Sequence, residues 1–215
     1  MIFYALPVST YSAKVRIVLV AKNIRFEERA PPDGYRSAAY RGIVPMGTLP
    51  AIDDDGFVLS ESEAINEYLE ERFPHPTLLP SSPQDRASVR FLSRFHDLYL
   101  EPPVRALFAH MSPAKRDGAV VAACAAQIDR RLTQLAQLAN PRPYLAGESL
   151  TLADCGFAAT LPLAQRLLEV LGQPLVLAQP LAAWPATVAA HPAVEKALAP
   201  WRTATEVWVA GQVKQ

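Results

Sequence analysis

The chain has 215 residues, half of them apolar, and its 21 Lys and Arg residues balance 21 Asp and Glu residues. This composition allows one large domain or two modest ones with a real hydrophobic core, and the balanced charge disfavours a nucleic-acid partner, because basic residues supply most of that affinity. No apolar run reaches the roughly 20 residues of a membrane span, and the opening residues, MIFYALPVSTYS, lack the basic and apolar regions of a secretory signal, so we expect a cytoplasmic protein.

The first thirty residues predict a strand, a helix and a second strand. Residues 2–6 are apolar and are closed by Pro7, which is typical of a strand. Apolar residues recur at helical spacing over 10–21, and Asn23 follows as a left-handed cap. A second strand is predicted over 25–28. Because such crossovers connect parallel strands with a right-handed turn, we expect the two strands to run parallel.

A turn over 31–34 and a short helix over 35–41 precede a predicted hairpin. Its apolar runs, 49–52 and 57–59, flank three aspartates and Gly56, and Asp-Gly between apolar runs is a strong hairpin signal. A helix over 61–73 follows, with Ser60 or Ser62 as its cap.

Four prolines between residues 74 and 83 exclude helix and strand there, and we place a domain boundary in this segment. The predicted fold is α/β plus all-α, with one domain over residues 1–76 and an all-helical domain over 85–215. The helices of the second domain are predicted over 85–100, 116–138, 151–171, 181–190 and 193–203.

The residue types that bind metals are not clustered. Cys124 and Cys155 have no C-x-x-C or Cys/His spacing, and the four histidines are scattered, so we expect two buried thiols and no metal site. Thr151 and Asp154 have the spacing of a capping box at the start of an apolar helix, which predicts a structural role.

The loop after the first strand carries hydroxyl groups at Ser9 and Ser12, with the spacing of a dithiol motif but oxygen in place of sulfur. Ligands of open α/β sheets sit at the carboxyl ends of strands, and a hydroxyl at a helix N-terminus stabilises a nearby anion such as a thiolate. The alternative is that Ser9 or Thr10 only caps the helix.

Seven short motifs together resemble the cytosolic-type glutathione transferase family over nearly the whole chain. They are Ser9, VRI from Val15, VPMGTLPAI from Val44, SESEAI from Ser60, LLP from Leu78, DRASVR from Asp85 and SLTLAD from Ser149. The DRASVR motif and the serine-led loop resemble serine-type, bacterial members on the zeta, theta and tau side. The resemblance implies a thioredoxin-like βαβ-α-ββα domain followed by an all-helical domain.

The resemblance also implies a glutathione site. Leu49 and Pro50 correspond to a cis peptide whose backbone pairs with the cysteinyl part of glutathione, beside Thr48, and Glu61 and Ser62 correspond to the pair that receives the γ-glutamyl end. Ser9 corresponds to the hydroxyl that hydrogen-bonds the sulfur, with Tyr11 and Ser12 as alternatives and Tyr4 as a third candidate. For the electrophile pocket we expect residues of the helical domain beside Tyr11, namely Phe95, Tyr99, Phe108 and His110.

The implied activity is the conjugation of glutathione, as a co-substrate and without a metal, to hydrophobic electrophiles by a homodimer. Two alternatives stay open. A glutathione-dependent isomerase of the maleylacetoacetate type or a dehalogenase would use the same thiolate, although Tyr11 stands where zeta-like relatives carry cysteine. A non-catalytic, protein-binding relative of the stringent-starvation type is the second, and the presence of Ser9, Glu61 and Ser62 argues against it.

Overall fold

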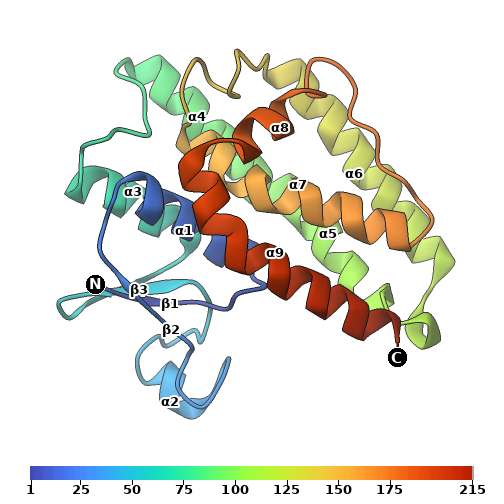
Figure 1. Cartoon of the computed structure of the whole chain (residues 1–215), viewed down its shortest axis with the longest axis horizontal. Coiled ribbons are helices and arrows are strands. Elements are labelled where there is room, and N and C mark those ends of the chain that lie inside the picture. Colours follow the sequence, from blue (N-terminus) through green and yellow to red (C-terminus); the bar gives the residue numbers. More distant parts are fainter. Residues whose placement is uncertain (215) are drawn as a thin grey trace.

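The computed structural model describes residues 1–214, and its amino-terminal part is built on a four-stranded sheet (Figure 1). The strands are β1 (Ile2–Tyr4), β2 (Glu27–Arg29), β3 (Ala51–Asp54) and β4 (Phe57–Ser60), in the order β2-β1-β3-β4. β1 and β2 pair in parallel, as the sequence predicts, whereas β3 pairs antiparallel with β1 and with β4. Asp55 and Gly56, both at positive φ, close the predicted hairpin between β3 and β4.

Three helices complete this part: α1 (Thr10–Ala21), α2 (Ala38–Arg41) and α3 (Ser62–Arg72). α1 has the predicted bounds, and Asn23 follows it with the left-handed φ of 53° expected of a cap. The predicted start of α2 is wrong by three residues, because Arg36 has a φ of 63°, which a right-handed helix excludes, and Ser37 caps the helix instead. α1 and α3 lie between the sheet and the carboxy-terminal helices, and α2 lies on the far side of the sheet (Figure 1).

The second part of the described chain is helical, which confirms a thioredoxin-like domain followed by an all-helical domain. Its helices are α4 (Pro83–Phe95), α5 (Glu101–Ala106), α6 (Gly118–Leu138), α7 (Leu152–Val170), α8 (Trp184–Ala189) and α9 (Pro192–Val213). A π-helical turn (His96–Leu100) joins α4 to α5, and two 3-10 turns (Leu107–His110 and Pro113–Lys115) lead to α6. The exact division at residues 76 and 85 stays a prediction.

Two predicted boundaries in this part are wrong for identifiable reasons. α9 does not end near residue 203 but continues through Pro200 to Val213, since its last turns are held by packing: Val209 is buried and the ring of Trp208 lies 5.0 Å from that of Phe108. α8 starts at Trp184 rather than at residue 181, because Pro185 fits the first turn of a helix.

α1 lies at the centre of the molecule, where it packs against α3, α7 and α9. Its apolar residues Val15, Ile17 and Leu19 are fully buried in a core that is continuous with that of the helical part. Cys124 and Cys155 are also buried and unpaired, as predicted. Among the described helices, none combines the length and the apolar character that a membrane crossing requires.

The start of α7 is fixed by the predicted capping box of Thr151 and Asp154. The buried carboxylate of Asp154 accepts hydrogen bonds from the backbone N–H of Thr151 at 3.0 Å and of Leu145 at 3.0 Å. It also accepts one from the indole N–H of Trp184 at 2.9 Å, so it ties α7 to the preceding loop and to α8. Its role in the structure is that of a cap.

The contact between α7 and the π-helical turn leaves no space for a side chain at Gly156. A Cβ atom built there would lie 2.5 Å from Nδ1 of the buried His96. We therefore expect Gly156→Ala to lower the free energy of unfolding by about 1–3 kcal/mol, the usual range for overpacking a core. Near Gly211 on α9, the described residues place no atom within 4 Å of the Cβ position apart from its chain neighbours and the adjacent backbone of the helix, so Gly211→Ala should instead raise stability by about 0.5–1 kcal/mol. Denaturant unfolding of both variants measures the two changes in the free energy of unfolding. Changes of the same sign and size would contradict the difference in packing between the two glycines.

Candidate functional site

Two cavities meet where α1 and α3 begin. The first, here called the polar cavity, has a volume of about 310 Å³, and the second, the apolar cavity, has about 240 Å³. Tyr35, Leu49 and Arg105 line both, so the two cavities adjoin at these residues. The polar cavity is otherwise lined by Tyr11, Thr48, Pro50, Glu61, Ser62, Glu63, Arg94, Asp97 and Leu98. The apolar cavity is otherwise lined by Leu6, Val8, Ser9, Thr10, Phe108, Leu163 and Trp208.

A larger open depression, of about 520 Å³, lies elsewhere, around Met1, Arg25 and His75. It contains none of the predicted site residues, whereas the two adjoining cavities contain most of them. The position of chemically suited side chains, rather than volume, therefore identifies the site.

Ser9 caps α1 and lines the apolar cavity. Its backbone is extended, with φ −76° and ψ 122°, and its Oγ accepts a hydrogen bond from the backbone N–H of Ser12 at 3.2 Å. Capping uses the oxygen as an acceptor, so the hydroxyl hydrogen is left to be donated to a ligand. Capping and ligand binding, the two alternatives that the sequence leaves open, are thus compatible. Ser12 itself is fully buried and is not among the described residues that line either cavity.

Tyr11 supplies a second hydroxyl on the polar side. Burial, together with the nearby carboxylates of Glu101 and Asp97, raises the pKa of Tyr11 to about 12. Its phenol therefore stays protonated at neutral pH and can donate a hydrogen bond. Tyr4, the third candidate, is buried, its ring packs 5.7 Å from that of Tyr40, and it is not among the described residues that line either cavity.

The wall of the polar cavity is formed by the segments on both sides of the β3–β4 hairpin. The Leu49–Pro50 peptide is cis, as the resemblance implies. Oγ1 of Thr48 is buried and has no hydrogen-bond partner in the described part of the chain. Glu61, just before α3, has a φ of 75°, a conformation that is uncommon for a residue other than glycine and that clusters at functional sites. Ser62 is the first residue of α3, where backbone N–H groups have no partner within the helix.

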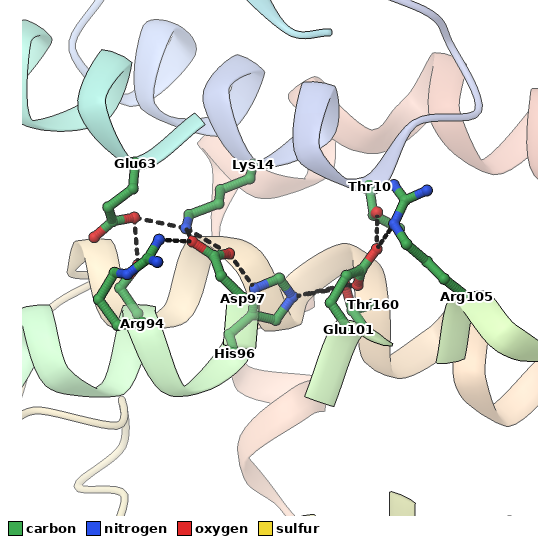
Figure 2. Close-up of polar contacts among 10 residues, drawn as sticks. Thr10, Lys14, Glu63, Arg94, His96, Asp97, Glu101, Arg105 and Thr160 are labelled. Carbon is green, nitrogen blue, oxygen red and sulfur yellow. Dashed lines mark hydrogen bonds and ion pairs between the residues drawn. The ribbon is translucent and has the colours of Figure 1, made fainter. Parts of the chain in front are cut away.

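A buried ion-pair cluster lies beneath the polar cavity (Figure 2). The ammonium of Lys14 on α1 is 2.6 Å from Oε2 of Glu63 and 3.0 Å from both carboxylate oxygens of Asp97. The side chain of Lys14 has no exposed surface. Arg94 adds a second positive charge, 3.1 Å from Asp97, and Oε1 of Glu63 is buried without a hydrogen-bond partner among the described residues. Glu63 and Asp97, two acidic side chains that line the polar cavity, are therefore held in place by the positive charges of Lys14 and Arg94.

The same chain of contacts continues toward the apolar cavity (Figure 2). His96 lies 2.8 Å from Asp97 through Nδ1 and 2.7 Å from Oγ1 of Thr160 through Nε2. The hydroxyl of Thr160 donates to Glu101 at 2.6 Å, and the hydroxyl of Thr10 donates to the other oxygen of Glu101. Arg105 closes the series, with Nε 3.2 Å from Glu101. Elements of both parts of the chain are thus linked by polar groups directly under the two cavities.

The residues that were expected in the electrophile pocket fall into two groups. The structure brings Phe108 to the apolar cavity and Tyr11 to the polar cavity. It does not bring Phe95, Tyr99 or His110 to either. Phe95 is buried and stacks on Tyr99 at 5.4 Å, while Nδ1 of His110 accepts a hydrogen bond from the backbone of Asp117. A helical residue that faces a neighbour and one that faces a cleft have the same sequence pattern, which is why these three were misplaced.

Sequence reasoning missed several residues that line the cavities. Trp208 reaches the apolar cavity from α9, in the turns that the predicted helix omitted. Arg94 and Asp97 line the polar cavity from the end of α4 and from the π-helical turn, and Arg105 follows that turn, which shifts the helical phase between α4 and α5. No motif in the sequence marks this turn, so only a relative of known structure could have revealed these residues.

Comparison with known proteins agrees with the sequence motifs. The amino-terminal domain of glutathione S-transferase matches residues 3–77, and the carboxy-terminal domain of that family matches residues 96–192. The chain is 34% identical over 162 residues to a stringent starvation protein A homolog of Pasteurella multocida, covering 74% of this chain and 71% of that protein. It is 31% identical over 163 residues to a glutathione S-transferase of Pseudomonas putida, covering 73% of this chain and 71% of that protein. The structure of a bacterial zeta-class maleylpyruvate isomerase superposes with a TM-score of 0.78 at 29% identity, over 93% of this chain and 97% of that one.

The ion-pair cluster predicts a specific acid sensitivity. Burial raises the pKa of Asp97, but the hydrogen bond from His96 and the charge of Lys14 outweigh it and hold the pKa at about 2. A carboxyl whose pKa is lower in the folded state stabilises the fold above its unfolded pKa of about 4 and loses this contribution as the pH falls toward 2. We expect Asp97→Asn to lower the free energy of unfolding by about 2 kcal/mol at pH 7. This difference in unfolding free energy between the variant and the wild type should become smaller between pH 4 and pH 2.

Urea unfolding at a series of pH values measures that difference. Asp129→Asn, at an exposed position of α6, is the matched control and should differ little from the wild type at any pH. A difference for Asp97→Asn that stays constant down to pH 2 would show that the charge of Asp97 is not what stabilises the cluster.

Proposed function

The chain belongs to the glutathione S-transferase family, and from that premise we propose that it binds glutathione in the polar cavity and joins it, through its sulfur, to a hydrophobic electrophile in the apolar cavity. The observation that carries this proposal is the adjacency of the two cavities, one lined mainly by charged and polar groups and the other mainly by apolar ones, with the Ser9 hydroxyl in the lining of the second. Glutathione is a zwitterionic tripeptide with a thiol near its middle. Such a molecule fits the polar side and presents its sulfur to the apolar side.

The polar cavity offers a partner for each part of the γ-glutamyl group. The carboxylate of Glu61 pairs with its ammonium, and the backbone N–H and hydroxyl of Ser62 bind its carboxylate at the start of α3, where the helix dipole favours an anion. The backbone of Leu49 pairs with the cysteinyl residue in the manner of an added strand, ahead of Pro50. The Oγ1 of Thr48 supports the same placement, because a polar ligand would supply the hydrogen bond that no described residue provides.

The chemistry proposed is activation of the thiol. A free thiol has a pKa of about 8.5, so it is mostly protonated at neutral pH, and only the thiolate is a good nucleophile. The Ser9 hydroxyl donates a hydrogen bond to the sulfur and thereby stabilises its anion, assisted by the positive end of the α1 dipole. The thiolate attacks the electrophilic carbon, a carbon–sulfur bond forms, and the leaving group departs with the electron pair of its own bond. Tyr11 is the alternative donor.

Three other functions are the alternatives for this site. A glutathione-dependent isomerase is supported by the likeness to maleylpyruvate isomerase, and it would use the same thiolate without forming a stable conjugate. A dehalogenase would also use this thiolate, and halide would be the leaving group. A non-catalytic, protein-binding role is supported by the likeness to a stringent starvation protein A homolog. Turnover of an aromatic halide to a stable glutathione conjugate favours the transferase, whereas glutathione binding without turnover of any electrophile favours the protein-binding role.

We also propose a homodimer in the cytoplasm. The support is the exposure of four large apolar side chains on β4, α4 and the π-helical turn, namely Phe57, Phe91, Leu98 and Tyr99. A second copy of the chain would cover such side chains.

Removing the hydroxyl of Ser9 should slow turnover without preventing glutathione binding. Ser9→Ala is expected to lower kcat/KM by roughly 10- to 100-fold, because the thiol pKa returns toward that of free glutathione. Ser9→Gly is the matched control: it also lacks the hydroxyl, but glycine caps a helix nearly as well as serine. Equal losses in both variants assign the effect to the hydroxyl. If turnover is unchanged in both and falls in Tyr11→Phe, Tyr11 is the donor.

Neutralising Glu61 should weaken the binding of glutathione itself. We expect Glu61→Gln to raise the dissociation constant by about 10-fold or more, since a hydrogen-bonded charge pair is lost while the side-chain shape is kept. A glutathione analogue that lacks the γ-glutamyl amino group is the control, because its affinity should not respond to the substitution. Calorimetry measures both. An equal loss for the two ligands would contradict the pairing with the ammonium.

A further inference from the structure

Arg105 is placed to recognise a negative charge on the electrophile, which the proposed transfer reaction does not require. Its side chain is about 40% exposed and lines both cavities at their border. Among the described residues that line the apolar cavity, Arg105 carries the only charge. We propose that Arg105 binds a carboxylate of the electrophile, so that the preferred substrates are aromatic or unsaturated electrophiles that carry a carboxylate. This inference rests on the proposed function and narrows its substrate class.

The guanidinium has hydrogen-bond donors left for a ligand. Its contact with Glu101 is made through Nε, and Figure 2 shows the two terminal nitrogens pointing away from that carboxylate. Glu101 is fully buried and also accepts hydrogen bonds from Thr10 and Thr160, so it does not depend on the terminal nitrogens of Arg105. A guanidinium has five N–H donors, of which one edge can bind a carboxylate while Nε–H remains on Glu101.

Neighbouring rings hold the guanidinium at the border. It lies over the ring of Tyr11, 4.8 Å from its centroid, and 5.8 Å from the centroid of Phe108. Such stacking restricts the rotamers of the arginine, so less entropy is lost when a ligand binds. A planar carboxylate on an aromatic ring can therefore meet the fork of Arg105 while the ring packs on Phe108.

The distribution of charge decides on which side an anion binds. The polar cavity is lined by three carboxylates, those of Glu61, Glu63 and Asp97, and in the proposed complex it also holds the carboxylates of glutathione, so a further anion is disfavoured there. The described lining of the apolar cavity has no acidic side chain, and its polar side chains other than Arg105 are uncharged: the hydroxyls of Ser9, Thr10 and Tyr35 and the indole of Trp208. In such surroundings a charge-assisted hydrogen bond is stronger than in water. The carboxylate of an electrophile is therefore drawn to Arg105 from the apolar side.

Two glutathione conjugates that differ in one group test the proposal by binding alone. They are S-(4-carboxy-2,6-dinitrophenyl)glutathione and its 4-carboxamide, which have nearly the same shape but differ in charge. Their dissociation constants can be read from the quenching of tryptophan fluorescence, since Trp208 lines the apolar cavity. We expect the wild type to bind the carboxylate at least about 10-fold more tightly than the amide, the usual effect of a hydrogen bond to a charged group.

Three variants separate the contribution of the Arg105 guanidinium from that of positive charge alone and from that of an arginine elsewhere on the surface. Arg105→Met should reduce the carboxylate preference by about 10-fold, and Arg105→Lys by a smaller factor, because lysine keeps the charge beside Glu101 but not the planar fork. Arg105→Lys also keeps the test valid if the methionine variant does not fold. Arg166→Met on α7 is the matched control, since Arg166 has a similar exposure of 38% and also pairs with glutamate, and it should leave the preference unchanged.

The outcomes distinguish this inference from the function on which it rests. Equal affinity of the wild type for the two conjugates, or a preference that persists in both Arg105 variants, overturns the role of Arg105. The glutathione site then still stands if both conjugates bind and if 4-chloro-3,5-dinitrobenzamide is turned over. Failure of both conjugates to bind overturns the proposed function, and this inference with it.

Discussion

The burial of Lys14 is the constraint on which the rest of the structure depends. Its side chain has no exposed surface, and a buried ammonium is costly unless carboxylates and hydrogen bonds surround it. Those carboxylates come from distant points of the sequence, Glu63 on α3 and Asp97 after α4. One charge on α1 therefore fixes α3 and the helical part of the chain relative to α1. Removing Lys14 would leave the carboxylates of Glu63 and Asp97 without their shared ammonium, and removing either carboxylate would leave the buried Lys14 with one partner instead of two.

This constraint places the starts of α1 and α3 at the same pair of cavities. Ser9 and Ser62 stand at those two starts, where unpaired N–H groups and the positive ends of the helix dipoles are found. The chain of contacts that begins at Lys14 ends at Glu101 and Arg105, so the acidic lining of one cavity and the basic border of the other belong to one buried network. Rigid support of this kind keeps a thiol and its hydrogen-bond donor in register, which is what activation of a nucleophile needs.

The sequence allowed most of the amino-terminal part to be predicted, because its signals are local. The bounds of α1, the parallel pairing of β1 and β2, and the Asp55-Gly56 hairpin all follow from periodicity and turn chemistry. Leu49, Glu61 and Ser62 were found through family motifs, and the structure places them in one cavity, although their roles toward glutathione remain proposals. The helical part was less predictable. Arg105 and Trp208 reach the site through the phase shift of a π-helical turn and the continuation of α9 past Pro200, and neither leaves a local pattern. Phe95, Tyr99 and His110 were misplaced because amphipathicity does not reveal which neighbour a helix face meets.

The central claim is that this site turns the thiol of glutathione into a thiolate at neutral pH. The measurement that tests it most directly is the ultraviolet absorbance of the thiolate in the complex, recorded as a function of pH with the free enzyme subtracted. The account predicts a titration midpoint about two pH units below the value of about 8.5 for a free thiol. A midpoint equal to that of free glutathione, in a complex shown to be saturated, would contradict it.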